Sequence, residues 1–329
     1  MKIYNYTLDV VRVIAMFGVI LDHYLQQSCS KILINSGLWI GGGSVAVFLA
    51  ILAYLYGIKW RESGCIGINV VDFIKKRSLR IFIPLWLTLL FAIPLELYAG
   101  HELNVQTVFL NLFGLGWFSP LMWNGHLWYI TMTLIMYILF LLISRVRFLS
   151  ELSIWIYVVA LAGFSVVIVV LPSMFASVFK TIVPLTLLYA TMIFTIGDKI
   201  LGICCKNKRV LLLLTVFLLC ASYYLHCWQY DLYKGLAFFS SALFGLFTFL
   251  TIMTLVKLRK QNRVISWLSK RSYEIYLIHP SMMCIVLMWM GKSWMGVPVG
   301  IVMIVISGYV VNTISSQLYK SVSYTHLTL

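Results

Sequence analysis

Residues Leu8 to Gln26 read LDVVRVIAMFGVILDHYLQ, and this segment decides how the rest of the chain is interpreted. It is apolar enough to span a membrane, yet it contains Arg12 in its first half and Asp22 and His23 near its end. Ionisable groups are costly in hydrocarbon, so they normally face a protein interior or a watered cavity and indicate a functional site. Arg12 and His23 are eleven residues apart, which returns a helical side chain to within roughly 20° after a rise of about 16 Å. The sequence therefore predicts one polar helix face with a cation and an acid-base group at two depths.

A structural reading of the same residues stays open. The Arg12 side chain, one turn into the helix, can extend to the lipid headgroups, and His23 at the helix end can lie in the membrane interface. The choice between the two readings depends on the other segments of the chain.

The composition is that of a polytopic membrane protein. Hydrophobic residues make up 62% of the 329 residues and charged residues 11%, and the mean hydropathy is +0.96. The formal net charge of +15 does not indicate nucleic-acid binding, because the Lys and Arg residues lie in short clusters between apolar segments. The seven cysteines show no spacing typical of a metal site. No metal and no permanently bound cofactor are expected.

The apolar segments predict an all-α bundle of about ten transmembrane helices, at about 20 residues per span. The predicted spans are Leu8 to Gln26, Leu38 to Ile58, Leu79 to Tyr98, His126 to Ile143, Leu152 to Leu171, Phe179 to Gly197, Val210 to Cys227, Gly235 to Val256, Ser272 to Met290 and Val297 to Leu318. We expect one membrane domain over residues 1–320. Residues 321–329 are expected to be a polar tail, either disordered or not native.

The distribution of Lys and Arg predicts the orientation. With the N-terminus in the cytoplasm, 20 of the 25 Lys and Arg residues fall in segments on the cytoplasmic side. Both termini are then cytoplasmic, and Asp22 and His23 lie toward the outer side.

A basic cluster precedes the third predicted span, in the sequence FIKKRSLRIFIPLW of residues 73–86. Arg77 and Arg80 are three residues apart, so they share a helix face and, with Lys76 beside them, can bind one anion together. The phosphates of coenzyme A suit such a site. The cytoplasmic excess of positive charge explains the same cluster without any ligand.

Two further groups of polar and aromatic residues occur at helix ends. His126, Trp128 and Tyr129 open the fourth span at the outer surface, either as an interfacial aromatic belt or as platforms for a sugar ring. Ser272, Tyr276 and His279 are spaced four and three apart, which predicts a polar stripe entering from the cytoplasmic side. Hydrogen bonding between helices also explains such a stripe.

These motifs resemble, in order and over essentially the whole chain, the acyltransferase-3 family of bacterial integral-membrane acyltransferases. The family signature is Arg or Lys, ten residues, then His, which Arg12 and His23 match. The likeness continues through KKRSLRIFIPLW, GHLWYI and SYEIYLIHP, and ten helices also fit.

The resemblance implies an enzyme of the bacterial cytoplasmic membrane that transfers an acyl group, often acetyl, from cytoplasmic acyl-coenzyme A to a hydroxyl of a glycan or lipid-linked sugar. In that scheme Arg77, Arg80 and Lys76 bind the donor, and Arg12 orients it or stabilises the thioester oxygen. His23 takes the hydroxyl proton, with Asp22 or another acid holding its ring, or carries the acyl group covalently. Self-association of the chain stays open.

Two other function classes remain at this stage. A flippase or exporter of a polysaccharide precursor also needs polar stripes in a helix bundle, although a proton-coupled carrier usually has carboxylates at mid-membrane. A catalytically silent scaffold is favoured only by the second span. It has Leu52, Ala53 and Tyr54 where the family usually has Ser-Gly-Tyr or Ser-Gly-Phe.

Overall fold

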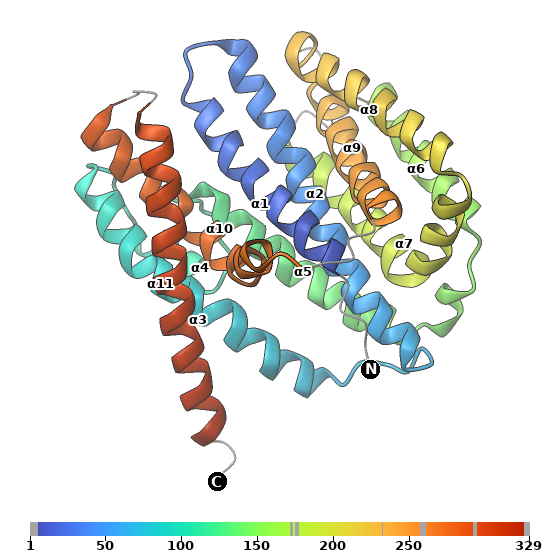
Figure 1. Cartoon of the computed structure of the whole chain (residues 1–329), viewed down its shortest axis with the longest axis horizontal. Coiled ribbons are helices and arrows are strands. Elements are labelled where there is room, and N and C mark those ends of the chain that lie inside the picture. The colour runs from blue at the N-terminus through green and yellow to red at the C-terminus, as the bar shows by residue number, and fades with distance from the viewer. Residues whose placement is uncertain are drawn as a thin grey trace. The chain divides into compact units, whose positions relative to one another are not determined.

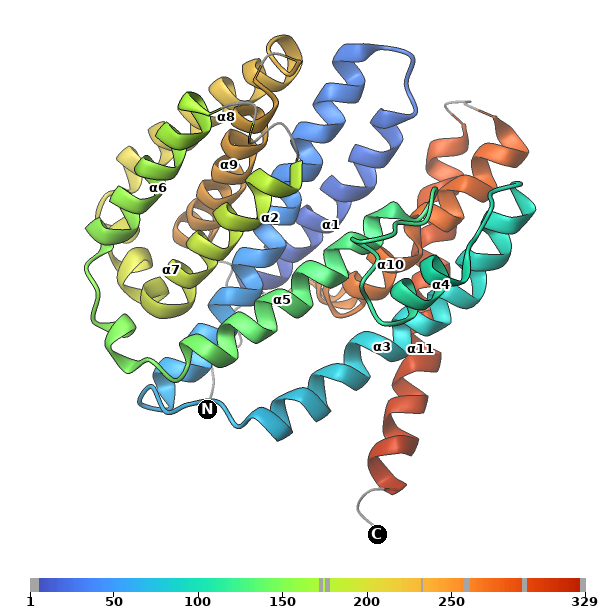
Figure 2. The same cartoon turned by 180° about the vertical axis from the view of Figure 1, so that it is seen from behind.

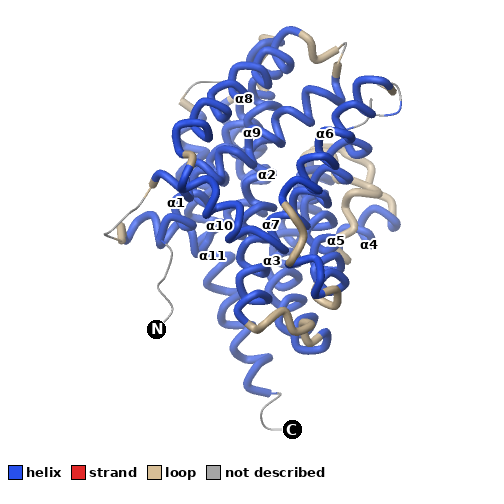
Figure 3. Tube along the Cα trace, turned by 90° about the vertical axis from the view of Figure 1, so that its right-hand side faces the viewer, coloured by secondary structure: helices blue, strands red, loops and turns tan. Residues whose placement is uncertain are grey.

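The structure is a computed structural model, which describes residues 6–171, 174, 178–231, 233–256, 261–291 and 295–325. Within these residues the chain forms helices joined by turns and loops, with no strand (Figure 3). The prediction of an all-α fold is confirmed.

The described part contains eleven α-helices and two short 3-10 helices. They are α1 (Tyr6–Gln26), α2 (Lys31–Glu62), α3 (Val70–Tyr98), α4 (Val105–Leu112), η1 (Gly125–Leu127), α5 (Trp128–Ile143), η2 (Arg147–Ser150), α6 (Ile154–Val170), α7 (Val178–Lys206), α8 (Lys208–Trp228), α9 (Lys234–Leu255), α10 (Arg263–Met290) and α11 (Gly296–Thr325). Residues 326–329 of the predicted tail lie outside the described residues.

Eight helices are long and apolar enough to cross a membrane, so the chain is a multi-pass membrane protein. The other two predicted spans are present as helices with weaker membrane character. Helix α1 carries three charged residues, Asp9, Arg12 and Asp22, and α6 is only 17 residues long. A straight helix of that length extends about 26 Å, against about 30 Å of hydrocarbon.

Several helices continue beyond the predicted spans. Helix α3 begins at Val70 rather than at residue 79, and α10 begins at Arg263 rather than at residue 272. The predicted starts of these two helices were wrong because hydropathy identifies only the apolar part of a helix. The helical backbone hydrogen bonds continue through the polar residues that precede it. Asn69 caps α3, with its side chain accepting a hydrogen bond from the backbone N–H of Asp72.

The chain divides into two compact units, each described by itself. Unit 1 consists of Met1–Ile68 and Met136–Ser269. Its central element is α2, which packs against α1, α7, α8 and α9, as Figure 1 shows. Helix α6 packs against α7 and α9.

Glycines allow the backbones of α1, α2 and α9 to approach closely. A Cβ on Gly18 of α1 would lie 2.1 Å from the Ser44 hydroxyl oxygen of α2. On the other side of α2, a Cβ on Gly245 of α9 would lie 2.2 Å from the Gly43 carbonyl oxygen. Small residues at such crossings are the usual means of helix packing in membranes.

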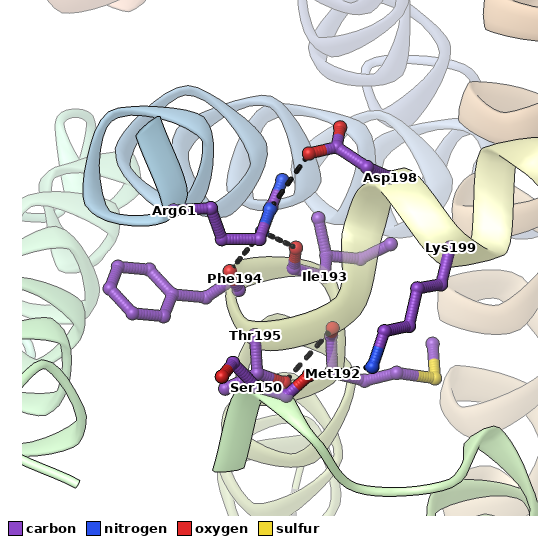
Figure 4. A network of polar contacts seen from close by, with 8 residues as sticks. All are labelled: Arg61, Ser150, Met192, Ile193, Phe194, Thr195, Asp198 and Lys199. Atoms are coloured by element: carbon purple, nitrogen blue, oxygen red, sulfur yellow. Dashed lines mark hydrogen bonds and ion pairs between the residues drawn. The ribbon is translucent and has the colours of Figure 1, made fainter. Parts of the chain in front are cut away.

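Helix α7 is kinked, and Arg61 of α2 binds the carbonyls at the kink (Figure 4). The backbone leaves helical geometry at Ile196, with φ −126° and ψ 19°. The Arg61 guanidinium donates to the carbonyls of Phe194 and Ile193, and its Nε donates to Asp198 Oδ2 at 2.8 Å. Arg61 thus satisfies carbonyl groups that a kink takes out of the ladder.

Unit 2 consists of Asn69–Ile135 and Lys270–Leu329. Helix α3 packs against α11 and the short helix α4, which follows it in the chain (Figure 2). Gly308 of α11 faces α10, where a Cβ would lie 2.9 Å from the Cα of Ile275.

The contact between α2 and the α7 kink predicts a selective effect of glycine substitution. A Cβ on Gly57 would lie 2.3 Å from the Phe194 carbonyl oxygen. We expect Gly57→Ala to lower the free energy of unfolding by about 1–3 kcal/mol, as overpacking does. The measurement is the thermal unfolding of purified protein in detergent.

Gly163→Ala is the matched control, because a Cβ at this position in α6 meets no atom within 4 Å. It should leave stability unchanged or raise it by up to about 1 kcal/mol, since alanine favours a helix over glycine. Equal melting temperatures for Gly57→Ala and the wild type would contradict the close approach of α2 and α7.

Candidate functional site

A buried polar cluster joins the start of α1 to the start of α10 in unit 1. Asp9, only 2% exposed, accepts a hydrogen bond from the Ser269 hydroxyl at 2.6 Å and from the Ser266 hydroxyl at 3.0 Å. Gln261 donates to the Ser266 hydroxyl at 2.8 Å. The buried carboxylate is therefore hydrogen-bonded, as a buried charge requires.

Arg12 belongs to the same cluster. Its Nη1 donates to the Ser269 hydroxyl at 2.9 Å and lies 3.7 Å from Asp9 Oδ1, with 26% of the side chain exposed. The guanidinium is therefore held against α10 rather than extended along lipid. Asp9 was not predicted as a site residue, although an acid three residues before Arg12 on one helix face was a usable signal.

Asp22 and His23 lie near the other end of α1. Asp22 is buried, and Gln26, one turn on, donates to its Oδ1 at 2.6 Å. Gly41 of α2 makes room for this carboxylate, because a Cβ there would lie 2.1 Å from Asp22 Oδ2. His23 is half-buried. Gly37 of α2 also faces Asp22, with its Cβ position 3.2 Å from Asp22 Oδ1, so two glycines one turn apart make room for Asp22.

In unit 2, five of the six residues predicted to bind an acceptor lie in one continuous series of ring contacts. In spatial order the series is Trp117, Trp128, Tyr129, Tyr276, His126 and His279. Successive ring centroids are 6.1, 6.4, 5.1, 5.2 and 4.9 Å apart.

Hydrogen bonds fix the inner members of the series. The Tyr276 hydroxyl donates to the His126 carbonyl at 2.7 Å, and His126 Nε2 lies 3.1 Å from the Leu277 carbonyl oxygen. His126, Tyr276 and His279 are buried, whereas Trp128 and Tyr129 are half-buried. Ser272, one turn before Tyr276, is also buried. Together they provide imidazole and phenol groups next to partly exposed aromatic rings.

The predicted donor residues lie in the first turns of α3. Lys76 and Arg80 are exposed and Arg77 is half-buried. The Arg80 guanidinium lies over the Tyr319 ring of α11, 5.7 Å from its centroid. A cation–π contact of this kind helps to orient the guanidinium.

A second polar network of unit 2 was not predicted from the sequence. Glu96 is fully buried near the end of α3 and accepts hydrogen bonds from residues of the loops that follow. A single carboxylate near the end of an apolar helix gives no sequence pattern, so only the structure reveals its partners. Within the described residues, no group of three or more His, Cys, Asp or Glu could hold a metal ion.

The Asp9 cluster predicts a stability effect. Asp9→Ala removes the acceptor of two hydroxyls and leaves Arg12 without its carboxylate, so we expect a loss of about 3 kcal/mol in the free energy of unfolding. Asp231→Ala is the control, since Asp231 and Lys31 form an exposed ion pair worth less than about 1 kcal/mol. Thermal unfolding in detergent measures both, and an equally small effect at Asp9 would contradict its burial as a charged group.

Comparison with protein families identifies the chain. A family model described as an acyltransferase domain, that of the acyltransferase-3 family, matches residues 5–313. Comparisons with curated proteins and with solved structures gave no match. The matched region includes both groups of site residues, from Arg12 and His23 in α1 to His279 in α10. Since the match covers nearly the whole sequence, the chain belongs to the acyltransferase-3 family.

Proposed function

We propose that the chain is a membrane O-acyltransferase that moves an acyl group, acetyl in the first instance, from cytoplasmic acyl-coenzyme A to a hydroxyl of a glycan or lipid-linked sugar. Membership of the family supports membrane acyl transfer in general. The choice of donor and catalytic base is supported by one observation on α1. Arg12 is held by a hydrogen bond near one end of this helix, and half-buried His23 lies near the other end.

The donor end of the reaction uses the basic residues of α3. Arg77 and Arg80 lie on one helix face, and Lys76 adds a third positive charge to this short segment. Guanidinium groups bind phosphate in bidentate fashion, so these side chains suit the diphosphate and the ribose phosphate of coenzyme A. Arg12, held by Ser269, has a fixed position from which to orient the thioester or stabilise its oxygen.

The chemical step uses His23 as a general base. Its neutral ring takes the proton of the acceptor hydroxyl while the hydroxyl oxygen attacks the thioester carbonyl carbon. The new C–O bond forms and the C–S bond breaks. The imidazolium then returns the proton to the departing thiolate, giving the ester and free coenzyme A. A covalent acyl-histidine intermediate is the second route, in which His23 attacks the thioester first.

The acceptor end is assigned to the ring series of unit 2. Partly exposed Trp128 and Tyr129 offer apolar faces, and the buried His126, Tyr276 and His279 offer polar groups nearby. A small number of polar groups in an apolar surround is the usual make-up of a small-molecule site. The resemblance to bacterial integral-membrane acyltransferases supports the bacterial cytoplasmic membrane as the location.

The role of His23 is tested with radiolabelled acetyl-coenzyme A and membranes that contain the protein. We expect His23→Ala to lower label transfer to glycan or lipid by about 10²- to 10⁴-fold, the size of a general-base contribution. Leu21→Ala, an exposed neighbour on α1, is the control and should transfer at the wild-type rate.

Two results would argue against this scheme. Near-normal transfer by folded His23→Ala would remove His23 from the reaction. Absence of label transfer by the wild type, with a broad range of acceptors present, would favour the flippase or exporter reading.

The donor site is tested by the dependence of rate on acetyl-coenzyme A concentration. Arg77→Ala and Arg80→Ala should each raise the KM for the donor about tenfold or more, because each removes a charge-assisted hydrogen bond. Lys208→Ala is the matched control, since Lys208 is an exposed cation on the same predicted side but in unit 1. Equal effects in all three variants would mean that the cluster acts only through its general positive charge.

A further inference from the structure

Glu96 anchors two loops of unit 2 from inside the protein. The side chain is 0% exposed. Its Oε1 accepts hydrogen bonds from the backbone N–H groups of Trp123 and Asn124, at 2.8 and 3.1 Å, and from the Asn124 side-chain amide at 3.2 Å. Asn124 in turn accepts from the Ser281 hydroxyl of α10 at 2.8 Å. The carboxylate thus fixes the segment that carries Trp123.

The other carboxylate oxygen of Glu96 orients His101. The sequence ELYAGH of residues 96–101 ends α3 in a Schellman motif, with Gly100 at φ +81°. The His101 backbone N–H donates to the Glu96 carbonyl at 3.0 Å, which brings its ring to the Glu96 carboxylate. His101 Nδ1 lies 2.6 Å from Glu96 Oε2.

This pairing determines which ring atom faces a ligand. A carboxylate accepts hydrogen bonds, so Nδ1 carries the proton and donates it to Glu96. In the neutral ring, Nε2 is then an acceptor with its lone pair directed away from the carboxylate. The His101 side chain is 22% exposed. A buried acid therefore holds an imidazole whose other nitrogen is oriented for a hydroxyl.

An indole ring adjoins this imidazole. The Trp123 and His101 ring centroids are 5.0 Å apart, with the planes at 85°, and Trp123 is half-buried. A sugar has C–H faces that pack on an aromatic ring and hydroxyls that donate hydrogen bonds. Trp123 offers a ring for the C–H face, and the adjacent His101 offers an acceptor for a hydroxyl. Both residues lie on the face predicted to be away from the cytoplasm.

We propose that His101 and Trp123, positioned by Glu96, form a carbohydrate-binding site that takes a sugar ring of the acceptor. The proposal rests on the proposed function in one respect, namely that the acceptor is a glycan. His101 Nε2 accepts a sugar hydroxyl, and the Trp123 ring packs against the sugar. Glu96 is a positioning residue, since its oxygens are buried and already accept hydrogen bonds.

The substitution that isolates the proposed contact is His101→Asn. The amide nitrogen of asparagine can replace Nδ1 as the donor to Glu96, so the loop anchor is kept, whereas Nε2 is lost. Trp123→Leu is the second variant. It removes the ring but keeps the backbone N–H that donates to Glu96. Trp289→Phe is the matched control, an outer-end tryptophan of the same unit that is 79% exposed.

The measurement is saturation-transfer difference NMR of the full chain in lipid nanodiscs, free of sugar-headed detergent. The probes are the methyl glycosides of glucose, galactose and N-acetylglucosamine, without acyl donor. We expect at least one probe to bind the wild type, with Kd raised about tenfold or more in His101→Asn and Trp123→Leu, the size of one lost contact. Melting temperature and the Kd of Trp289→Phe should stay at their wild-type values.

The other outcomes overturn the proposal. Equal Kd values in the wild type and both variants, or no binding of any probe by the wild type, would remove this sugar site. An equal loss in Trp289→Phe would indicate an interfacial aromatic belt. If His101→Asn lowers the melting temperature, the Kd of Trp123→Leu alone tests the proposal. The binding measurement contains no acyl donor, so it is independent of the acetyl-transfer assay. Loss of the sugar site with persistent acetyl transfer would contradict only this proposal, and sugar binding without acetyl transfer would contradict only the proposed function.

Discussion

The free-energy cost of charge in hydrocarbon constrains this structure more than any other interaction. Asp9 and Asp22 are both buried on α1, and each is hydrogen-bonded within unit 1. Asp9 is bound by two hydroxyls of α10, whereas Asp22 is covered by α2, where Gly37 and Gly41 leave room for it. The position of Asp22 on α1 therefore depends on the glycines of α2. A site residue can be held in an apolar layer only where neighbouring backbones leave room for it.

Much of the fold could be predicted from the sequence because membrane helices satisfy their own backbone groups. Hydropathy predicted ten spans, and each of them corresponds to a helix of the structure. Arg12 and His23, which their spacing predicts to share a helix face, both lie in α1. The helix ends could not be placed in this way, since α3 and α10 begin with polar turns that hydropathy does not detect. The short helix α4 lies between the third and fourth predicted spans, and at eight residues it is too short for hydropathy to predict as a span.

The candidate site could be predicted only in part. The spacing of Tyr276 and His279 correctly indicated one helix face, and the structure adds that this face meets His126. Asp9 had a signal in its spacing from Arg12, whereas Glu96 had none, because its partners lie in loops whose path depends on tertiary packing. Pairwise spacing within one helix is encoded locally. Contacts that join a helix end to a distant loop are a property of the folded chain.

The kink of α7 has a mechanical consequence. A helix whose ladder is interrupted usually bends easily at that point, because the freed carbonyls gain or lose little when the angle changes. In α7 the same guanidinium binds two of these carbonyls and Asp198, so a change of angle would break several polar contacts at once. The bend at Ile196 is thus fastened to α2 through one side chain, so a change in the angle of α7 is coupled to the position of Arg61.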